Sequence, residues 1–177
     1  HEGPDFAPLA SPNGRMIAFL SADERGLFYN APRLRVMNVD GSGVRAIPGI
    51  DEGIEAITWA PDSKGLYFVA QDRGASNLWY AALGAAARQV TTGTHLLAAP
   101  TIAKTGIAFA VRTNPSLPPD VVRIDLKKPS GLLQITDVNA DLMTGTRIGE
   151  VEEIWYTSSG GARIQGWLVK PPSFDPS

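Results

Sequence analysis

The sequence predicts an all-β protein: a partial β-propeller of about three four-stranded antiparallel blades, followed by a β-hairpin. Three observations lead to this fold class. The chain repeats itself with a period in the forties, and each repeat holds four short strand-like runs. The 177 residues include 18 glycines and 14 prolines. No long window shows helical periodicity, so we expect many short strands joined by turns.

The repeat is clearest around the first turn and the second strand of each unit. The three runs are SPNGRMIAFLS (11–21), APDSKGLYFVA (60–70) and TIAKTGIAFAV (101–111). The first two share a Pro-Asn or Pro-Asp turn, and Phe19 aligns with Phe68. The third lacks this turn, and its alignment rests on Ile107 and Phe109. The three phenylalanines are 49 and then 41 residues apart, which is the length of one propeller blade.

Later strands recur in the same order. We align the third strands at 34–41, 77–84 and 121–126, and the closing strands at 45–47, 88–90 and 133–135. These alignments predict blades at residues 1–48, 49–93 and 94–137. In the second blade the expected strands are 55–60, 65–70, 77–82 and 87–92. The alanine-rich run 81–87 has high helix propensity, but the repeat places it at a strand end and in a turn.

A single blade cannot bury both of its faces, so the blades must stack. Three blades fall short of the four to eight that close a ring. We therefore expect either a part of a longer propeller or copies that self-associate through open blade edges.

Composition excludes several classes of function. With 16 basic and 18 acidic residues the formal charge is −2, which argues against nucleic-acid binding. No apolar run approaches the ~18 residues of a membrane span, so we expect no membrane partner. The absence of cysteine excludes disulfides, zinc–thiolate sites and a cysteine nucleophile, and it leaves the compartment undetermined.

The last forty residues do not continue the repeat. Residues 137–149 are expected to form a polar connector. Two strands follow at 151–157 and 163–169, joined by a turn at 158–162. Prolines 171, 172 and 176 then end the second strand in an extended linker. The expected unit is residues 138–177, a connector and a first hairpin.

The end of the chain resembles the propeller exit of the prolyl oligopeptidase family of serine peptidases, particularly its acylaminoacyl-peptidase and dipeptidyl-aminopeptidase-like members. The residues that match the exit are Ile135, Thr136 and Asn139, and those that match the following strand are Gly166, Trp167, Leu168, Pro171 and Pro172. The turn departs from the family pattern, with Gly160-Gly161 where Asp-Gly is usual.

This resemblance implies that the chain is the C-terminal part of a propeller plus the start of an α/β-hydrolase domain, most of which would follow Ser177. The implied parent enzyme hydrolyses short or N-acylated peptides, and its propeller caps the active site and filters access to it. The implied partners are the hydrolase domain and a peptide substrate.

The catalytic residues of a serine peptidase are not recognisable in this sequence. A serine peptidase of this type needs a nucleophile in a Gly-x-Ser-x-Gly elbow, a histidine and an aspartate. The elbow pattern is absent, and Gly41-Ser42-Gly43 is better interpreted as a hairpin turn after Asp40. His1 stands at the first position, and His95 is expected to be solvated in a loop between blades. We therefore expect no catalytic residue and no peptidase activity from this chain.

Other polar and aromatic groups are interpreted structurally. The acidic residues Asp51, Glu52 and Glu55 are expected in a solvated loop between blades. We expect edge-protecting charges at Glu150, Glu152 and Glu153, and surface charges at Arg33, Arg73 and Arg112. Asn38, Asp40 and Ser42 lack the distal glutamate of a calcium loop. The four tryptophans, Trp59, Trp79, Trp155 and Trp167, are expected in the core. The sequence thus predicts no cofactor and no metal site.

A second hypothesis is a stand-alone propeller that resembles TolB-like proteins and binds a protein partner through its loops. The tail separates the two hypotheses, because a binding propeller has no evident need for a hairpin and a Gly-Trp-Leu strand after its last blade.

Overall fold

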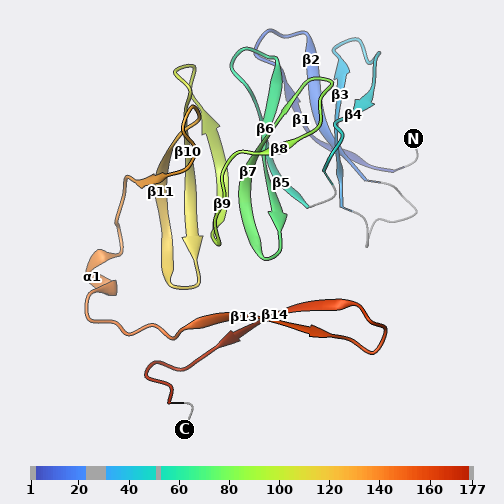
Figure 1. Ribbon diagram of the computed structural model, residues 1–177. Coiled ribbons are helices and arrows are strands. Elements are labelled where there is room, and N and C mark those ends of the chain that lie inside the picture. Colours follow the sequence, from blue (N-terminus) through green and yellow to red (C-terminus); the bar gives the residue numbers. More distant parts are fainter. Residues whose placement is uncertain (1–2, 23–30, 51–52, 176–177) are drawn as a thin grey trace.

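The computed structural model describes residues 3–22, 31–50 and 53–175, which form stacked antiparallel blades and a separate hairpin (Figure 1). Blade one contains β1 (Asp5–Ala10), β2 (Met16–Ser21), β3 (Arg33–Asn38) and β4 (Arg45–Ala46). Blade two contains β5 (Ile54–Trp59), β6 (Gly65–Asp72), β7 (Ala75–Ala82) and β8 (Arg88–Gln89). Blade three contains β9 (Leu96–Ile102), β10 (Ile107–Asn114), β11 (Leu117–Asp125) and β12 (Leu132–Gln134).

Strands pair in sequence order within each blade, as the repeat predicts. Blades two and three are joined by a single parallel bridge between Ser76 and Leu96, so they form one eight-stranded sheet by hydrogen bonding. The all-β partial propeller followed by a hairpin is therefore confirmed. No helix of the described residues is long and apolar enough to cross a membrane.

The turn between the first two strands is built alike in each blade. Its closing hydrogen bonds run from the N–H of Gly14, Ser63 and Gly106 to the carbonyl three residues earlier, at 2.8, 2.9 and 3.1 Å. The donor residues all have positive φ: 68°, 59° and 83°. The third turn is one residue shorter. Ser11 N–H bonds to the carbonyl of Met16, five residues on, whereas Ala103 N–H bonds to that of Ile107, four residues on.

This shorter turn corrects the alignment of the third repeat. Because side chains alternate along a strand, a slip of one residue exchanges the two faces. Ala108 and Ala110 occupy the inward positions that Leu66 and Phe68 occupy in blade two. Phe109 instead faces away from blade two and is 39% exposed. The predicted equivalence of Phe109 with Phe68 was wrong.

The third strand of blade two was also aligned one residue away from its true position, whereas the alignment of Leu34 with Val121 agrees with the structure. The closing strand bonds to Leu34 in blade one and to Leu78 in blade two, through the N–H groups of Ile47 and Val90. Leu34 therefore corresponds to Leu78 and not to Asn77.

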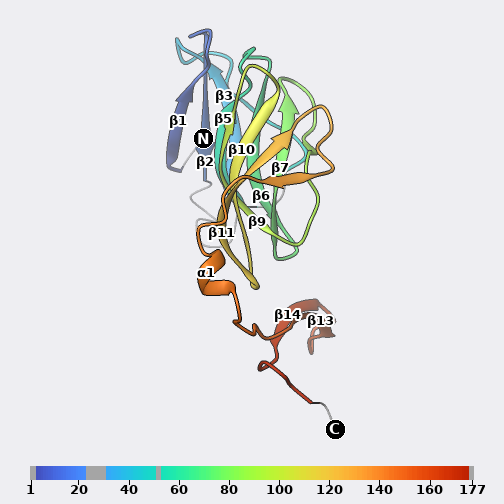
Figure 2. The ribbon, with the colours of Figure 1, turned by 90° about the vertical axis from the view of Figure 1, so that its left-hand side faces the viewer.

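Two cores hold the stack together, and the side view shows the blades overlapping along it (Figure 2). The core between blades one and two consists of Ala18, Leu20, Leu34, Val36, Ile47, Ile54, Trp59, Leu66, Phe68, Ala70 and Ala81. The core between blades two and three consists of Val69, Leu78, Val90, Leu97, Ala108, Ala110, Val122 and Ile124. Each fully buried leucine or phenylalanine contributes roughly 1.5–3 kcal/mol of transfer free energy.

The innermost strands of blades one and three each contain a β-bulge followed by proline. Ala7 and Ala99 have φ of 51° and 47°, and the strand registers shift there. Pro8 and Pro100 follow directly. Proline is tolerated at such positions because a bulge already interrupts the ladder of hydrogen bonds. Sequence reasoning missed this repeated Ala-Pro pair.

The segment 81–87 forms a strand end and a turn as predicted, with Ala85 N–H bonded to the carbonyl of Ala82. The predicted connector contains one short helix, α1 (Ala140–Met143), which has no buried residues. The predicted hairpin is confirmed as β13 (Val151–Thr157) and β14 (Arg163–Val169).

The tryptophans fall into two groups. Trp59 is buried and Trp79 packs against the first core. Trp155 and Trp167 are 41% and 46% exposed on the hairpin, so the core prediction was wrong for these two. A two-stranded hairpin has no second sheet packed against it, so large side chains on its strands remain exposed to solvent.

Candidate functional site

The C-terminal hairpin lies beneath one end of blades two and three, and the loops at that end form the candidate functional surface (Figure 1). We call it the hairpin-facing surface, and it consists of loops 72–75, 91–95 and 114–117. A cavity of about 280 Å³ lies between these loops and the hairpin, lined by Thr94, Asn114, Pro115, Ser116, Glu150, Val151 and Trp167.

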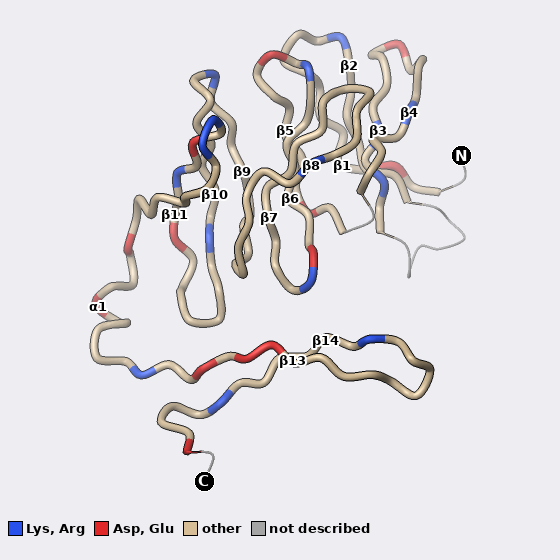
Figure 3. Tube along the Cα trace, in the orientation of Figure 1, with Lys and Arg blue, Asp and Glu red and all other residues tan. Residues whose placement is uncertain are grey.

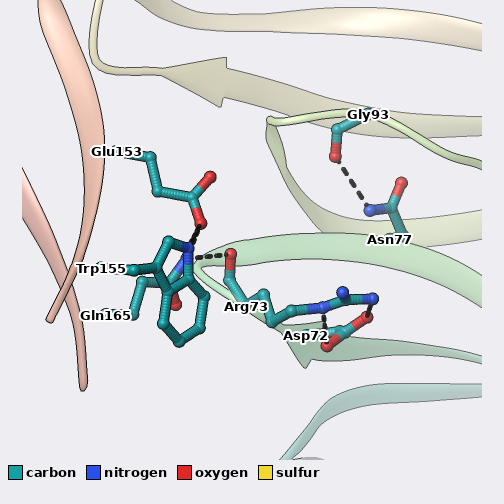
Figure 4. Close-up of polar contacts among 7 residues, drawn as sticks. All are labelled: Asp72, Arg73, Asn77, Gly93, Glu153, Trp155 and Gln165. Atoms are coloured by element: carbon teal, nitrogen blue, oxygen red, sulfur yellow. Dashed lines mark hydrogen bonds and ion pairs between the residues drawn. The ribbon is translucent and has the colours of Figure 1, made fainter. Parts of the chain in front are cut away.

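The tip of the β6–β7 hairpin contacts the C-terminal hairpin directly (Figure 4). Arg73 and Gly74 form its two-residue turn with φ of 47° and 73°, and positive φ at both positions fits strand twist. Gln165 Nε2 donates to the carbonyl oxygen of Arg73 at 2.9 Å and to Glu153 Oε1 at 2.9 Å. The amide of Gln165 therefore joins the blade tip to both strands of the hairpin.

Trp167 completes this contact by covering Gly74. A Cβ atom on Gly74 would collide with Cζ2 of the indole, so the site accepts only glycine at its present spacing. Gln165 and Trp167 lie on the hairpin face that meets the blades. The opposite face presents Ile154 and Leu168, which are exposed apolar side chains.

The three glutamates before and within β13 form the acidic run visible on that strand (Figure 3). Lys170 Nζ pairs with Glu150 at 3.3 Å and with Glu152 at 2.8 Å, and these two carboxylates raise the pKa of Lys170. Glu153 accepts hydrogen bonds from Gln165 and from the indole of Trp155. The run therefore neutralises a neighbouring cation and orders the hairpin.

His95 lies at the junction of blades two and three and is half-buried, so the prediction of a solvated side chain was wrong. Burial, and then the charge of Arg112, lower the pKa of its imidazole. The ring packs against Gly93, which leaves Nε2 buried without a hydrogen-bond partner. A general base needs a bonded nucleophile, and Nε2 has none.

The remaining charged residues singled out from the sequence lie on strands or at strand ends. Glu55 lies on β5 instead of in a loop, where it accepts hydrogen bonds from Gln71 and Ser76. Asp51 and Glu52 lie outside the described residues. Arg33 and Arg73 are exposed, and Arg73 pairs with Asp72 at 3.1 Å.

Arg112 differs from the predicted surface charge. It is half-buried on β10, and its Nη2 donates to Gln134 Oε1 at 2.9 Å.

The Gly41-Ser42-Gly43 segment is the turn between β3 and β4, as predicted. Ser42 donates to Asp40 Oδ1 from its hydroxyl at 2.6 Å and from its N–H at 2.9 Å, and these bonds lower the pKa of Asp40. Over the described ranges, no group of three or more histidine or acidic side chains could hold a metal ion.

The chain leaves blade three through a buried carboxylate that sequence reasoning missed. Asp120 Oδ1 accepts from the hydroxyl of Thr136 at 2.7 Å and from Val138 N–H at 3.2 Å. Its Oδ2 accepts from Gln134 Nε2 at 3.3 Å. We call these four residues the exit clamp. A cavity of about 400 Å³ lies beside it, between blade three and α1.

Blade two contains a neutral version of the same arrangement. Thr91 Oγ1 donates to Asn77 Oδ1 at 3.0 Å and accepts from Leu78 N–H at 2.9 Å. Asn77 Nδ2 donates to the carbonyl of Gly93 at 3.1 Å, which holds the loop to blade three (Figure 4). The repeated signal in the sequence is Gln-Val-Thr at 89–91 and Gln-Ile-Thr at 134–136.

Residues 35–164 match the family described as the lipoprotein LpqB β-propeller domain. The chain belongs to this family. The chain is 33% identical over 175 residues to dipeptidyl-peptidase 5 of Porphyromonas gingivalis, an alignment that covers 98% of the chain and 25% of the relative. It spans 25% and 18% of the length of two curated relatives, both peptidases by name.

Solved structures show the same fold. An acylaminoacyl peptidase of Pyrococcus horikoshii superimposes with a TM-score of 0.75 at 17% identity, covering 94% of this chain and 25% of that protein. A TolB-like protein of Agrobacterium tumefaciens gives a TM-score of 0.62 at 15% identity, covering 76% and 50%. The neighbours include dipeptidyl, acylaminoacyl and prolyl peptidases, in agreement with the resemblance to the prolyl oligopeptidase family.

Gly74→Ala is expected to release the C-terminal hairpin from the tip of the β6–β7 hairpin. The new Cβ collides with Trp167, and left-handed backbone costs a non-glycine residue about 1–2 kcal/mol. An undocked two-stranded hairpin is marginal, so amide hydrogen exchange in β13 and β14 should accelerate.

Gly41→Ala is the matched control for this change. Gly41 also has positive φ, at 84°, but nothing lies within 4 Å of its Cβ position. Equal exchange rates of β13 and β14 in the two variants would contradict the docking role of Gly74.

Proposed function

We propose that this chain is the non-catalytic propeller portion of a prolyl-oligopeptidase-type serine peptidase. In this proposal residues 1–48, 49–93 and 94–137 are three blades, and residues 138–177 lead through a connector and hairpin into an α/β-hydrolase domain. The observation that carries the proposal is the position of the hairpin. It does not continue the stack as a further blade but turns beneath the blade ends, held by Gln165 and Trp167.

The exposed face of the hairpin supports a further domain on that side. Ile154, Tyr156 and Leu168 lie on the face directed away from the blades, and all three are exposed. A contiguous apolar strand face is favourable only when another layer covers it. The hydrolase domain would supply that layer.

In the parent enzyme the serine, histidine and aspartate of the hydrolase domain would cleave short or N-acylated peptides. The propeller would lie over that centre and limit which chains reach it. The hairpin-facing surface suits this role because the ion pair of Arg73 with Asp72 places both signs of charge at the blade ends near the hairpin. Its contribution is selection by size and charge, without bond breaking.

Two proteins test the proposal: the 177-residue chain and the product of the complete coding sequence. A fluorophosphonate probe should label the complete protein, and labelling should abolish hydrolysis of peptide nitroanilides. The chain alone should neither react nor hydrolyse. Labelling of the chain, or a complete protein without a reactive serine, would refute the proposal.

The second candidate is a TolB-like propeller that binds a protein partner. The observation in its favour is the likeness to the TolB-like structure, which covers 76% of the chain. This second hypothesis gives the C-terminal hairpin no role. A complete protein that stays unlabelled by the probe would favour this candidate.

A further inference from the structure

The two blade junctions differ at the end of the stack opposite the hairpin (Figure 1). Between blades one and two, Asn13 N–H donates to Ser63 Oγ at 3.1 Å, and Trp59 Nε1 donates to the carbonyl of Leu9 at 2.9 Å. These bonds close the junction. They require a full-length turn and an indole just before it.

Neither feature is present between blades two and three. Ile102 stands directly before Ala103, where Trp59 stands before Ala60, and an isoleucine has no side-chain donor. The third turn is also one residue shorter, as its closing bond from Ala103 to Ile107 shows. A cavity of about 190 Å³ remains between these two blades. We call it the turn notch.

Two tyrosines form the inner wall of the turn notch. The rings of Tyr67 and Tyr80 are 4.7 Å apart and tilted by 47°. Neither hydroxyl has a hydrogen-bond partner within the part of the chain that the structure describes. Burial is the main cause that raises the pKa of both phenols, so both remain neutral donors at physiological pH.

Opposite charges line the notch from opposite blades. Asp62 belongs to the turn of blade two, and Lys104 belongs to the turn of blade three. Asp62 Oδ1 accepts from Lys64 N–H at 3.0 Å, and neither Asp62 nor Lys104 forms a salt bridge to another described residue. Arg88 lies over the ring of Tyr80, 5.3 Å from its centroid, and its cation is already engaged.

We propose that the turn notch binds a free α-amino acid with an apolar or aromatic side chain. The ammonium group would pair with Asp62, and the carboxylate with Lys104 and a phenol hydroxyl. The side chain would lie against the tyrosine rings. Both charged groups are exposed to solvent, and a zwitterion can pair with both at once, whereas a simple anion or cation can pair with only one of them. The site lies away from the hairpin-facing surface, so the proposal does not depend on the proposed function.

Calorimetric titration of the 177-residue chain with L-phenylalanine tests the proposal. We expect saturable binding with one site per chain. L-Phenylalaninamide lacks the carboxylate and 3-phenylpropionate lacks the ammonium group, so each should bind about tenfold more weakly or worse. Absence of saturable L-phenylalanine binding, or equal binding of all three compounds, would overturn the proposal.

Variants locate the site. Lys104→Gln should weaken L-phenylalanine binding about tenfold, and Tyr67→Phe together with Tyr80→Phe should weaken it further. Lys104 is exposed, so its replacement should leave the circular dichroism spectrum unchanged. Lys128→Gln is the matched control, because Lys128 is exposed on blade three and does not line the notch. Equal affinities for the Lys104 and Lys128 variants would refute this location.

Discussion

Phe68→Ala is expected to lower the free energy of unfolding by about 3–5 kcal/mol. Phe68 is fully buried between blades one and two, and its ring stacks on Trp79 with centroids 6.4 Å apart. Its removal leaves a cavity that two rigid sheets cannot close. Urea unfolding followed by far-ultraviolet circular dichroism, with the slope checked for constancy, measures the loss.

Phe109→Ala is the control that makes this prediction specific. By sequence alone Phe109 is the partner of Phe68 in the repeat, but the structure directs it away from the core at 39% exposure. Its replacement should cost under about 1 kcal/mol. Equal losses for the two variants would mean that the one-residue shift of blade three is wrong.

Asp120→Ala is expected to lower the free energy of unfolding by about 2–4 kcal/mol, because it removes three hydrogen bonds to a buried carboxylate at once. The hydroxyl of Thr136 and the N–H of Val138 would both lose their acceptor, and Gln134 would lose one of its own. The chain would also lose its fixed direction as it leaves blade three. Urea unfolding measures the stability, and limited proteolysis of residues 137–150 reports the release.

Asp120→Asn separates the hydrogen bonds from the charge. An asparagine keeps one acceptor oxygen, and blade two already uses Asn77 with Thr91 in this arrangement. We expect the asparagine variant to lose less than half as much stability as the alanine variant, with little gain in protease cleavage. If both replacements cost the same, the clamp depends on the negative charge and not on hydrogen-bond geometry.

The repeat and the hairpin could be predicted because their signals are local. Four strand runs per unit and turns of glycine, asparagine and aspartate specify antiparallel neighbours without knowledge of the third dimension. The same holds for the hairpin strands, whose bounds follow from the glycine-rich turn between them and the prolines after β14. The segment 81–87 shows the repeat outweighing helix propensity.

The register of blade three could not be predicted by aligning residue types between the repeats. Its turn is one residue shorter, and apolar residues at 107–111 occupy both faces of β10, so either alignment looks acceptable. The same limit explains the tryptophans. Strand position suggested burial for Trp155 and Trp167, but burial depends on which layer lies opposite.

The candidate surface was predictable only in part. The hairpin was expected, but its docking depends on Gly74 and Gln165, which are far apart in sequence and carry no motif. His95 was misplaced because a loop position does not reveal that its ring packs against Gly93, near the charge of Arg112. The exit clamp did leave a signal, since Gln-Val-Thr and Gln-Ile-Thr recur at the same place in successive blades.

The outermost strands have a consequence for how the chain meets other molecules. β4 and β8 contain two residues each and β12 contains three, so each blade tapers at its rim. A rim this short offers few free backbone groups to an incoming strand and is a poor template for amyloid-like growth. Self-association through open edges, expected from the sequence, stays a prediction, and the exposed Phe109, Leu133 and Ile135 give blade three an apolar outer face that a further layer would cover.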